Sequence, residues 1–189
     1  MTLALAYHGT SQVAGGGGTP AISEFIRPDG DVETTDWSST PLYAKLDDNS
    51  DSDYVISDAS TQVWPSYDTY DFECSLENPS GTPATGGVQG IKMRARLGID
   101  QANTPGLPGN ADFTFRLKQG STVIASQTYS TGTLASPSTR TYTLNSTEVN
   151  SITDHDDLRF FVTVNIGHAS GSPDLEARVF WAEVEYYAL

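Results

Sequence analysis

The sequence predicts an all-β protein: a two-sheet antiparallel β-sandwich with jelly-roll strand order and an extended N-terminal arm. Short segments in which apolar and polar residues alternate recur along most of the chain, and clusters drawn from 17 glycines and 10 prolines separate them. Alternation with a period of two is typical of half-buried strands, and frequent glycine and proline oppose long helices. Many short strands of this kind favour two packed sheets over one open sheet.

The N-terminal residues 1–20 form the predicted arm, and residues 21–189 form the predicted single sandwich domain. Four consecutive glycines, Gly15 to Gly18, indicate a flexible linker within the arm. The segment LALAY before them is suited to add as a strand to another sheet edge. The arm residues predicted to contact a partner are Leu3, Leu5, Tyr7 and Val13.

The first third of the sandwich reads as short extended segments joined by turns. AISEFIR leads into a tight turn at Pro28-Asp29-Gly30, whose proline and glycine suit turn dihedrals. VETTDW and LYAKL follow as extended segments, and YVIS is the next strand. No helix is expected in this region.

Two segments alternate most regularly, Tyr70 to Glu77 and Ile91 to Leu97. The polar positions of the first are mostly acidic, and those of the second are basic. If the two strands pair, contacts between Asp or Glu and Lys or Arg would help to set their register. Opposite charge on the outward faces therefore predicts that these strands are neighbours.

The second half of the chain predicts the remaining strands. FTFRLKQGSTVIASQTY reads as a hairpin and TRTYTLN as the next strand. Ser146 to Ile152 predicts one helical turn, capped by Ser146, with Val149 and Ile152 facing inward. LRFFVTVNI and EARVFWAEVEYY then predict two largely apolar strands.

The net charge of −14 is unevenly distributed along the chain. Residues 1–90 hold 14 acids and two bases, a charge of −12, whereas residues 91–189 hold 10 acids and eight bases, a charge of −2. Nucleic-acid binding requires a basic stripe that replaces counterions, so no nucleic-acid partner is expected. We interpret the acidic residues as a surface that keeps the protein soluble. The alternative is that they bind a partner with a basic surface.

Cysteine content and hydropathy further restrict the class of protein to which the chain could belong. The single cysteine, Cys74, excludes an intrachain disulfide and a metal knuckle built on cysteines. The N-terminus shows no basic region followed by an apolar core, and no apolar run approaches the roughly 20 residues that span a bilayer. We therefore expect a protein made in the cytoplasm that has no membrane partner.

One acidic loop superficially copies a calcium-binding loop, with oxygen ligands at alternate positions. The ligands would be Asp47, Asn49, Asp51, Asp53 and Asp58. Ser52 stands where such a loop needs glycine, and the flanking segments are not helical. The loop is therefore interpreted as solvated, no cofactor is expected, and Ca²⁺ binding is the alternative.

No catalytic pattern stands out. His155 lies among three aspartates but has no partner histidine at ligand spacing, so it is interpreted as part of a turn before a strand. The serine of Gly167 to Gly171 falls one place late for a nucleophile elbow. No enzymatic activity is predicted. Trp37 and Trp64 could instead form a sugar-stacking platform, with core packing as the favoured interpretation of the aromatic residues.

A family resemblance covers the chain from about Ile26 to Tyr187. The sequence resembles the β-sandwich modules of tailed-bacteriophage virion proteins. The segments that carry the resemblance are ETTDW, LYAKLDDNSDSDYVIS, FECSLENP, IKMRARLGI, FTFRLKQGSTVIASQTY, TYTLNSTEVNSITDHDDLRFFVTVNI and ARVFWAEVEYY. They are patterns of strand alternation and turn chemistry, not catalytic signatures.

The resemblance implies a non-enzymatic structural protein located on the capsid surface of a virion. The favoured role is capsid decoration, in which a cement protein binds the assembled head and stabilises the shell. The implied partners are the major capsid protein or other virion proteins, and copies would cluster at symmetry axes as a homo-oligomer such as a trimer. A tail or fibre component, or a carbohydrate-binding module for host adsorption, is the alternative.

Overall fold

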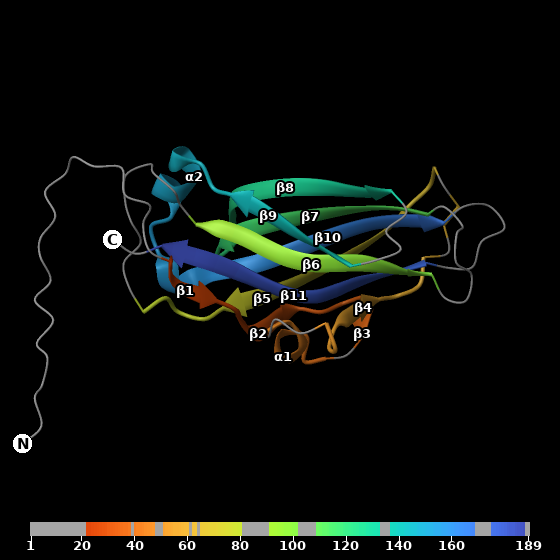
Figure 1. Ribbon diagram of the computed structural model, residues 1–189, viewed down its shortest axis with the longest axis horizontal. Helices are drawn as coiled ribbons and strands as arrows, with labels where there is room; N and C mark the ends of the chain where they lie inside the picture. Colours follow the sequence, from red (N-terminus) through yellow and green to blue (C-terminus); the bar gives the residue numbers. More distant parts are fainter. Residues whose placement is uncertain are drawn as a thin grey trace, which may run out of the picture.

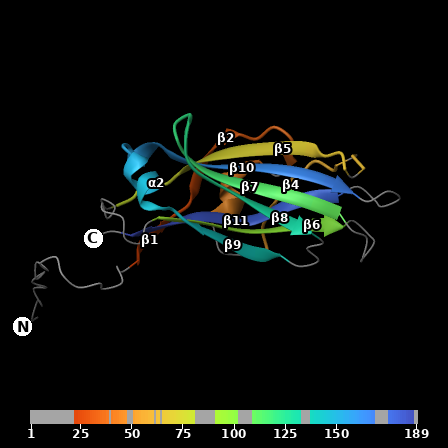
Figure 2. The ribbon, with the colours of Figure 1, turned by 90° about the horizontal axis from the view of Figure 1, so that it is seen from above.

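A computed structural model describes residues 22–38, 40–47, 51–60, 62–63, 65–80, 91–101, 109–132, 137–168 and 175–187. These residues form two antiparallel β-sheets packed face to face, so the predicted β-sandwich is confirmed (Figures 1 and 2). The predicted arm, with Leu3, Leu5, Tyr7 and Val13, lies outside the described residues.

The first sheet, called sheet A, has six strands. Its main path runs through β3 (Trp37–Ser38), β4 (Val55–Ser57), β11 (Leu175–Tyr187), β6 (Lys92–Gln101) and β9 (Ser138–Thr143). The sixth strand, β1 (Ile22–Ile26), also pairs with β11. Every strand pair in this sheet is antiparallel.

The second sheet, called sheet B, has five strands. Their order is β2 (Pro28–Glu33), β5 (Asp68–Leu76), β10 (Leu158–His168), β7 (Gly109–Gln119) and β8 (Thr122–Gly132). Figure 2 shows β5 and β10 in one layer, with β11 and β9 in the layer beneath.

The eight consecutive strands from β4 through β11 pair in the order of a jelly roll. The first strand of this run pairs with the last, β5 pairs with β10, β6 with β9, and β7 with β8. This nested order is that of one long hairpin rolled into two facing sheets. The predicted jelly-roll order is therefore confirmed.

The predicted pairing of Tyr70 to Glu77 with Ile91 to Leu97 is wrong. The first segment lies on β5 in sheet B and the second on β6 in sheet A, because the connection between them crosses from one sheet to the other. Each strand finds its opposite charges elsewhere: β6 pairs with the acidic β11, and β5 pairs with β10. The predicted alternation holds along Ile91 to Leu97, whereas in β5 it is interrupted at Glu73, which is also buried.

The predicted hairpin forms as β7 and β8, joined at Gly120. The φ of this glycine is +54°, a region that residues with a side chain adopt only at a cost. Its backbone amide donates to the carbonyl of Asp157 at 3.0 Å, which ties the turn to the segment before β10.

Inward-facing side chains of the two sheets form one core. Most of its members are aliphatic, and its largest fully buried side chains are Phe72, Phe113, Phe115 and Phe160. The rings of Phe115 and Phe160 lie 5.7 Å apart. Each such side chain contributes roughly 1.5–3 kcal/mol by leaving water, so the core holds the two sheets together.

The early segments differ from their predictions at two places. Pro28-Asp29-Gly30 does not turn but opens strand β2, with an irregular register against β5. LYAKL forms a helical turn, α1 (Tyr43–Leu46). The carboxylate of Asp31 accepts two backbone hydrogen bonds at the start of this turn: Oδ2 accepts from Leu42 N at 2.9 Å, and Oδ1 accepts from Tyr43 N at 2.8 Å. This cap comes from β2, so no signal within LYAKL announces it.

The turn α1 seals one side of the sandwich. Strands β1 and β4 pair with different ends of β11, and α1 packs against β11 and β2 between them. Leu42 and Leu46 are fully buried there. Figure 1 shows α1 at the margin of the sandwich beside β2 and β4.

The predicted helical turn before β10 is confirmed as α2 (Ser146–Ser151). Val149 and Ile152 are buried, as predicted, but the cap is Asn145 rather than Ser146. A short 3₁₀ turn, η1 (His155–Asp157), then leads into β10, which agrees with the interpretation of His155 as part of a turn. Among the described helices, none has the length and apolar character needed to cross a membrane.

Candidate functional site

The outer face of sheet A carries a row of basic side chains beside a row of acidic ones. Lys92, Arg94 and Arg96 alternate along β6, and Glu183 and Glu185 lie opposite on β11. Arg94 Nη1 lies 2.8 Å from Glu183 Oε1, and Lys92 Nζ lies 3.1 Å from Glu185 Oε1. These ion pairs cross-link the two central strands of the sheet.

Glu183 is the most deeply buried acid of this row. Its side chain is only 1% exposed, and Arg27 Nη2 approaches it at 3.4 Å in addition to Arg94. Burial raises the pKa of Glu183, while Arg94 and Arg27 act in the opposite direction. The carboxylate therefore depends on its two arginines to remain charged in this position.

Arg94 is also held between two aromatic rings. Its guanidinium lies 5.5 Å from the ring centre of Phe25 on β1 and 5.6 Å from that of Trp181 on β11. A guanidinium over a ring face gains electrostatic attraction as well as packing. The contact fixes the basic row against β1 and β11.

A bulge in β11 brings two consecutive aromatic residues to this outer face. Val179 pairs with Leu97 and Trp181 with Arg96, so Phe180 is the extra residue. Both flanking residues, Val179 and Ala182, are fully buried in the core, which leaves Phe180 and Trp181 together on the other side of the strand. Phe180 packs against Tyr54, with ring centres 5.5 Å apart.

The bulge borders a shallow cavity of about 430 Å³. Asp51, Arg96, Thr139 and Trp181 line it. Arg96 and Asp51 form an ion pair across one side, and Thr139 is the neighbour of Arg96 on β9. The cavity thus combines an aromatic side chain with a cation, a carboxylate and a hydroxyl group, and we take it as the candidate ligand site.

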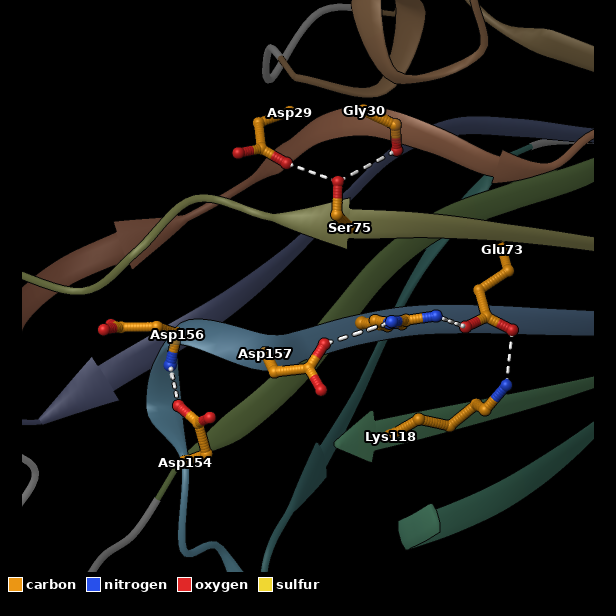
Figure 3. Close-up of polar contacts among 9 residues, drawn as sticks. Asp29, Gly30, Glu73, Ser75, Lys118, Asp154, Asp156 and Asp157 are labelled. Carbon is orange, nitrogen blue, oxygen red and sulfur yellow. Dashed lines mark hydrogen bonds and ion pairs between the residues drawn. The ribbon is translucent and has the colours of Figure 1, made fainter. Parts of the chain in front are cut away.

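The outer face of sheet B is organised around a buried carboxylate. Glu73 on β5 accepts from Lys118 of β7, and from Arg159 of β10 at 3.4 Å. Arg159 also donates to Asp157 at 3.1 Å, so one network spans three strands (Figure 3). Figure 3 further shows Ser75 between Asp29 and the backbone of Gly30, where Ser75 Oγ donates to Asp29 Oδ1 at 2.6 Å.

Phe161 lies next to this network on β10. Lys118 Nζ is 4.9 Å and the Arg116 guanidinium 5.2 Å from its ring centre. Arg116 also donates to Thr163 Oγ1 at 2.6 Å. The cationic side chains on the outer face of sheet B therefore contact other residues of that face, as those on sheet A do.

The acidic loop has other partners in the structure. Asp53 Oδ1 lies 3.3 Å from Lys45 Nζ, and Asp51 pairs with Arg96. Asp47 and Asp58 are exposed, and Asn49 lies outside the described residues. Within the described part of the chain, no cluster of three or more His, Cys, Asp or Glu residues has the geometry of a metal site. Calcium binding by this loop stays a prediction.

Of the two tryptophans predicted for sugar stacking, the structure describes only Trp37. Trp37 is only 6% exposed and packs edge-on against Phe72 at 4.8 Å, so its ring faces belong to the core. Trp64 lies outside the described residues. Trp181 is buried to the same extent as Trp37, 6% exposed, as its predicted place in the core requires, and it also lines the cavity on the outer side of sheet A. The run Val179 to Ala182 breaks the period of two, and that break was the available signal.

Comparison with known proteins does not assign the chain to a family. No protein-family model matches the chain, and no curated protein matches its sequence. One similar solved structure is TmCBM61 in complex with beta-1,4-galactotriose, at a TM-score of 0.41 and 8% sequence identity. The match covers 87% of this chain and 90% of that one. A likeness at this level says nothing about what this chain binds.

Proposed function

We propose that this protein is a non-enzymatic structural protein of a tailed-phage virion, which binds the assembled head as a decoration protein. The proposal rests on the position, in the fold, of the segments that resemble phage virion proteins. FTFRLKQGSTVIASQTY is the β7–β8 hairpin, and ARVFWAEVEYY is most of β11, the central strand of sheet A. The resemblance therefore rests on framework strands of the jelly roll.

The side chains on both outer faces support a role in holding surfaces. Ion pairs link β6 to β11 on sheet A, and β5 to β7 and β10 on sheet B. These contacts brace each sheet across its strands and make the sandwich a stiff unit. A stiff unit loses little conformational freedom on binding, which favours attachment to a fixed surface.

The mechanism is stabilisation by mass action. A protein that binds only the assembled shell stabilises that shell by an amount set by its concentration relative to its dissociation constant. The exposed Asp47 and Asp58 belong to the acidic first half of the chain and would face basic patches on the shell. Such charges contribute mainly to the rate and specificity of association.

The direct test is addition of the purified chain to tailed-phage heads that lack it. We expect saturable co-sedimentation and a higher temperature of DNA release from the heads. A variant lacking residues 2–19 tests the arm, with Asp47→Asn/Asp58→Asn as a variant that changes only the charge of the sandwich. Heads that neither retain the full chain nor gain stability from it would refute the proposal.

Carbohydrate binding is the second candidate, and the cavity beside the β11 bulge favours it. Sugars are recognised by an aromatic surface together with a few polar groups that fix their orientation. Trp181 supplies the aromatic group, and Arg96, Asp51 and Thr139 supply donors and acceptors. The site would serve adsorption to a glycan-bearing host.

A glycan array separates the two candidates. Carbohydrate binding predicts a saturable signal that Thr139→Ala weakens and that Thr143→Ala, farther along the same face of β9, leaves unchanged. Both threonines pair with basic residues of β6, so the two variants are matched in their surroundings. An array without a saturable signal would remove this candidate and leave decoration untouched.

A further inference from the structure

The guanidinium of Arg96 is only partly engaged in the cavity beside the β11 bulge. Within the described part of the chain its ion-pair partner is Asp51, and the contact is made through Nε. No described residue pairs with its terminal nitrogens, Nη1 and Nη2. The paired N–H groups of a guanidinium match the two oxygens of a carboxylate. Arg96 can therefore donate to a second carboxylate that enters the cavity.

The other two basic residues of β6 are held by acids that are themselves buried. The side chains of these partners, Glu183 and Glu185, are 1% and 7% exposed. The side chain of Asp51, by contrast, is 51% exposed and belongs to the loop before β4. Exposed ion pairs contribute little net free energy. The pair of Asp51 with Arg96 is therefore the one that a ligand can replace most easily.

The remaining lining groups indicate the rest of the ligand. Trp181 is nearly buried, and the Arg94 guanidinium lies 5.6 Å from its ring centre, so little of the ring is available for stacking. Thr139 is exposed beside Arg96, and its hydroxyl makes no hydrogen bond to any described residue. A ligand of this cavity therefore needs a carboxylate and hydroxyl groups more than it needs an apolar face.

We propose that the cavity binds an acidic sugar, such as a uronic acid, with its carboxylate on Arg96 and a hydroxyl group on Thr139. The inference rests on carbohydrate binding, the second candidate function above, and names the class of sugar. Asp51 is then a competitor, because its carboxylate holds the guanidinium before the sugar binds. The volume of about 430 Å³ lies within the usual range of small-molecule sites.

The net charge of −14 does not oppose an anion strongly at this place. At physiological ionic strength, exposed charges more than about 8 Å apart are largely screened from one another. Arg96, Thr139 and Trp181 all belong to residues 91–189, whose eight bases and 10 acids give a charge of only −2. When Asp51 turns toward solvent, Arg96 is the charged group that remains among the described lining residues.

The test compares two tetrasaccharides of the same linkage, one of glucuronate and one of glucose. Their rings differ only in a carboxylate or a hydroxymethyl group, and isothermal titration calorimetry with the full chain measures both affinities. We expect glucuronate to bind roughly tenfold or more tightly, because hydrogen bonds between charged groups are the stronger ones. Equal affinity would overturn the inference and leave carbohydrate binding in place. Absence of binding by both sugars would remove the inference together with the carbohydrate candidate.

The variant Asp51→Asn distinguishes a competitor from a ligand contact. It keeps the size of the side chain but removes the negative charge, so glucuronate affinity should rise by roughly two- to fivefold while glucose affinity stays unchanged. A gain in affinity cannot result from misfolding. Loss of glucuronate affinity in this variant would overturn the role given to Asp51.

Arg96→Gln should weaken glucuronate binding by roughly tenfold or more and remove the preference over glucose. Lys92→Gln is the matched control, because it removes the same charge from the same face of β6 and leaves Glu185 with Arg94 at 3.7 Å. Circular dichroism shows whether each variant is folded. A folded Arg96→Gln variant that retains the preference would place the carboxylate elsewhere.

A tetraglutamate peptide distinguishes an acidic sugar from any chain of carboxylates. We expect it to bind more weakly than glucuronate, because it has no hydroxyl groups to pair with Thr139. Thr139→Ala should accordingly weaken the binding of glucuronate and leave that of the peptide unchanged. A peptide that binds as tightly as the sugar would overturn the assignment of a sugar ligand.

Discussion

At the scale of single residues, Glu183 links stability to pH. Its pKa in the folded protein is raised because its side chain is buried between β6 and β1. The unfolded chain therefore releases this proton at a lower pH than the folded protein does. In the pH interval between the two pKa values, the folded protein binds more protons than the unfolded chain. This group thus lowers the stability of the fold as pH rises through that interval.

The variant Glu183→Gln removes this titration. We expect the unfolding free energy of the variant, minus that of the natural protein, to increase as pH rises above the usual range of a glutamate pKa. Urea unfolding at a series of pH values measures this difference, and the other acids cancel because both proteins share them. A difference that is constant with pH, or that moves the other way, would contradict the raised pKa.

Residue placement on the sheets could be predicted from the sequence wherever the alternation is regular. Met93 is buried and Arg94 is partly exposed, as the period of two requires. Trp181 could not be placed in this way, because one extra residue in β11 reverses the sides beyond it. A bulge depends on the register with the neighbouring strands, and a single strand's sequence does not contain that register.

At the scale of elements, α2 has a cap that can be tested against its neighbour. Asn145 Oδ1 accepts from Thr147 N at 2.9 Å and from Glu148 N at 3.0 Å, and Glu148 Oε2 accepts from Asn145 N at 2.7 Å. This is a capping box, in which both side chains satisfy free amides.

We expect Asn145→Ala to lower the unfolding free energy by about 1 kcal/mol, the usual cost of a lost cap. Ser146→Ala should change it little, because Ser146 is exposed and lies within the helix. Thermal or urea unfolding of the two variants gives the comparison. A larger loss for Ser146→Ala would support the cap first predicted from the sequence.

Local elements were predictable to the extent that their causes are local. The β7–β8 hairpin contains its own turn glycine, and α2 contains its own buried face. The helix α1 was missed because Asp31, which caps it, belongs to another strand. The pairing of β5 with β6 was predicted from charge alone, but the jelly roll separates neighbours in the chain between two sheets.

At the scale of the whole molecule, Cys74 reports on the integrity of the core. It is fully buried on β5, and burial raises the pKa of its thiol far above the usual range. The thiolate is the reactive form, so the native protein should react with a thiol reagent at pH 8 more than about 100-fold more slowly than the unfolded chain.

The variant Ser121→Cys provides the matched control, because Ser121 is exposed in the turn between β7 and β8. It should take up one label rapidly in the native state and a second only after unfolding. Rapid labelling of the natural protein under native conditions would place Cys74 outside the core. Labelling against denaturant concentration would then give the global unfolding transition.

The candidate site could be predicted only in part at this scale. The acidic loop and the basic strand around Arg96 are evident in the sequence, but their meeting through Asp51 requires the folded sandwich. The cavity draws on the loop and on three strands of sheet A, β9, β6 and β11. Such sites depend on long-range pairing, which alternation within one segment does not specify.

The position of β10 and β11 also constrains how the chain is made. Each is central in its sheet, and each follows in the sequence every strand that pairs with it. When β1 to β9 have been made, the described strands can form only four pairs: β2 with β5, β3 with β4, β6 with β9, and β7 with β8. The central strand of each sheet is still missing. Neither sheet can close until residues 158–187 emerge from the ribosome, so folding of this sandwich waits for them, and unpaired edges are exposed until then.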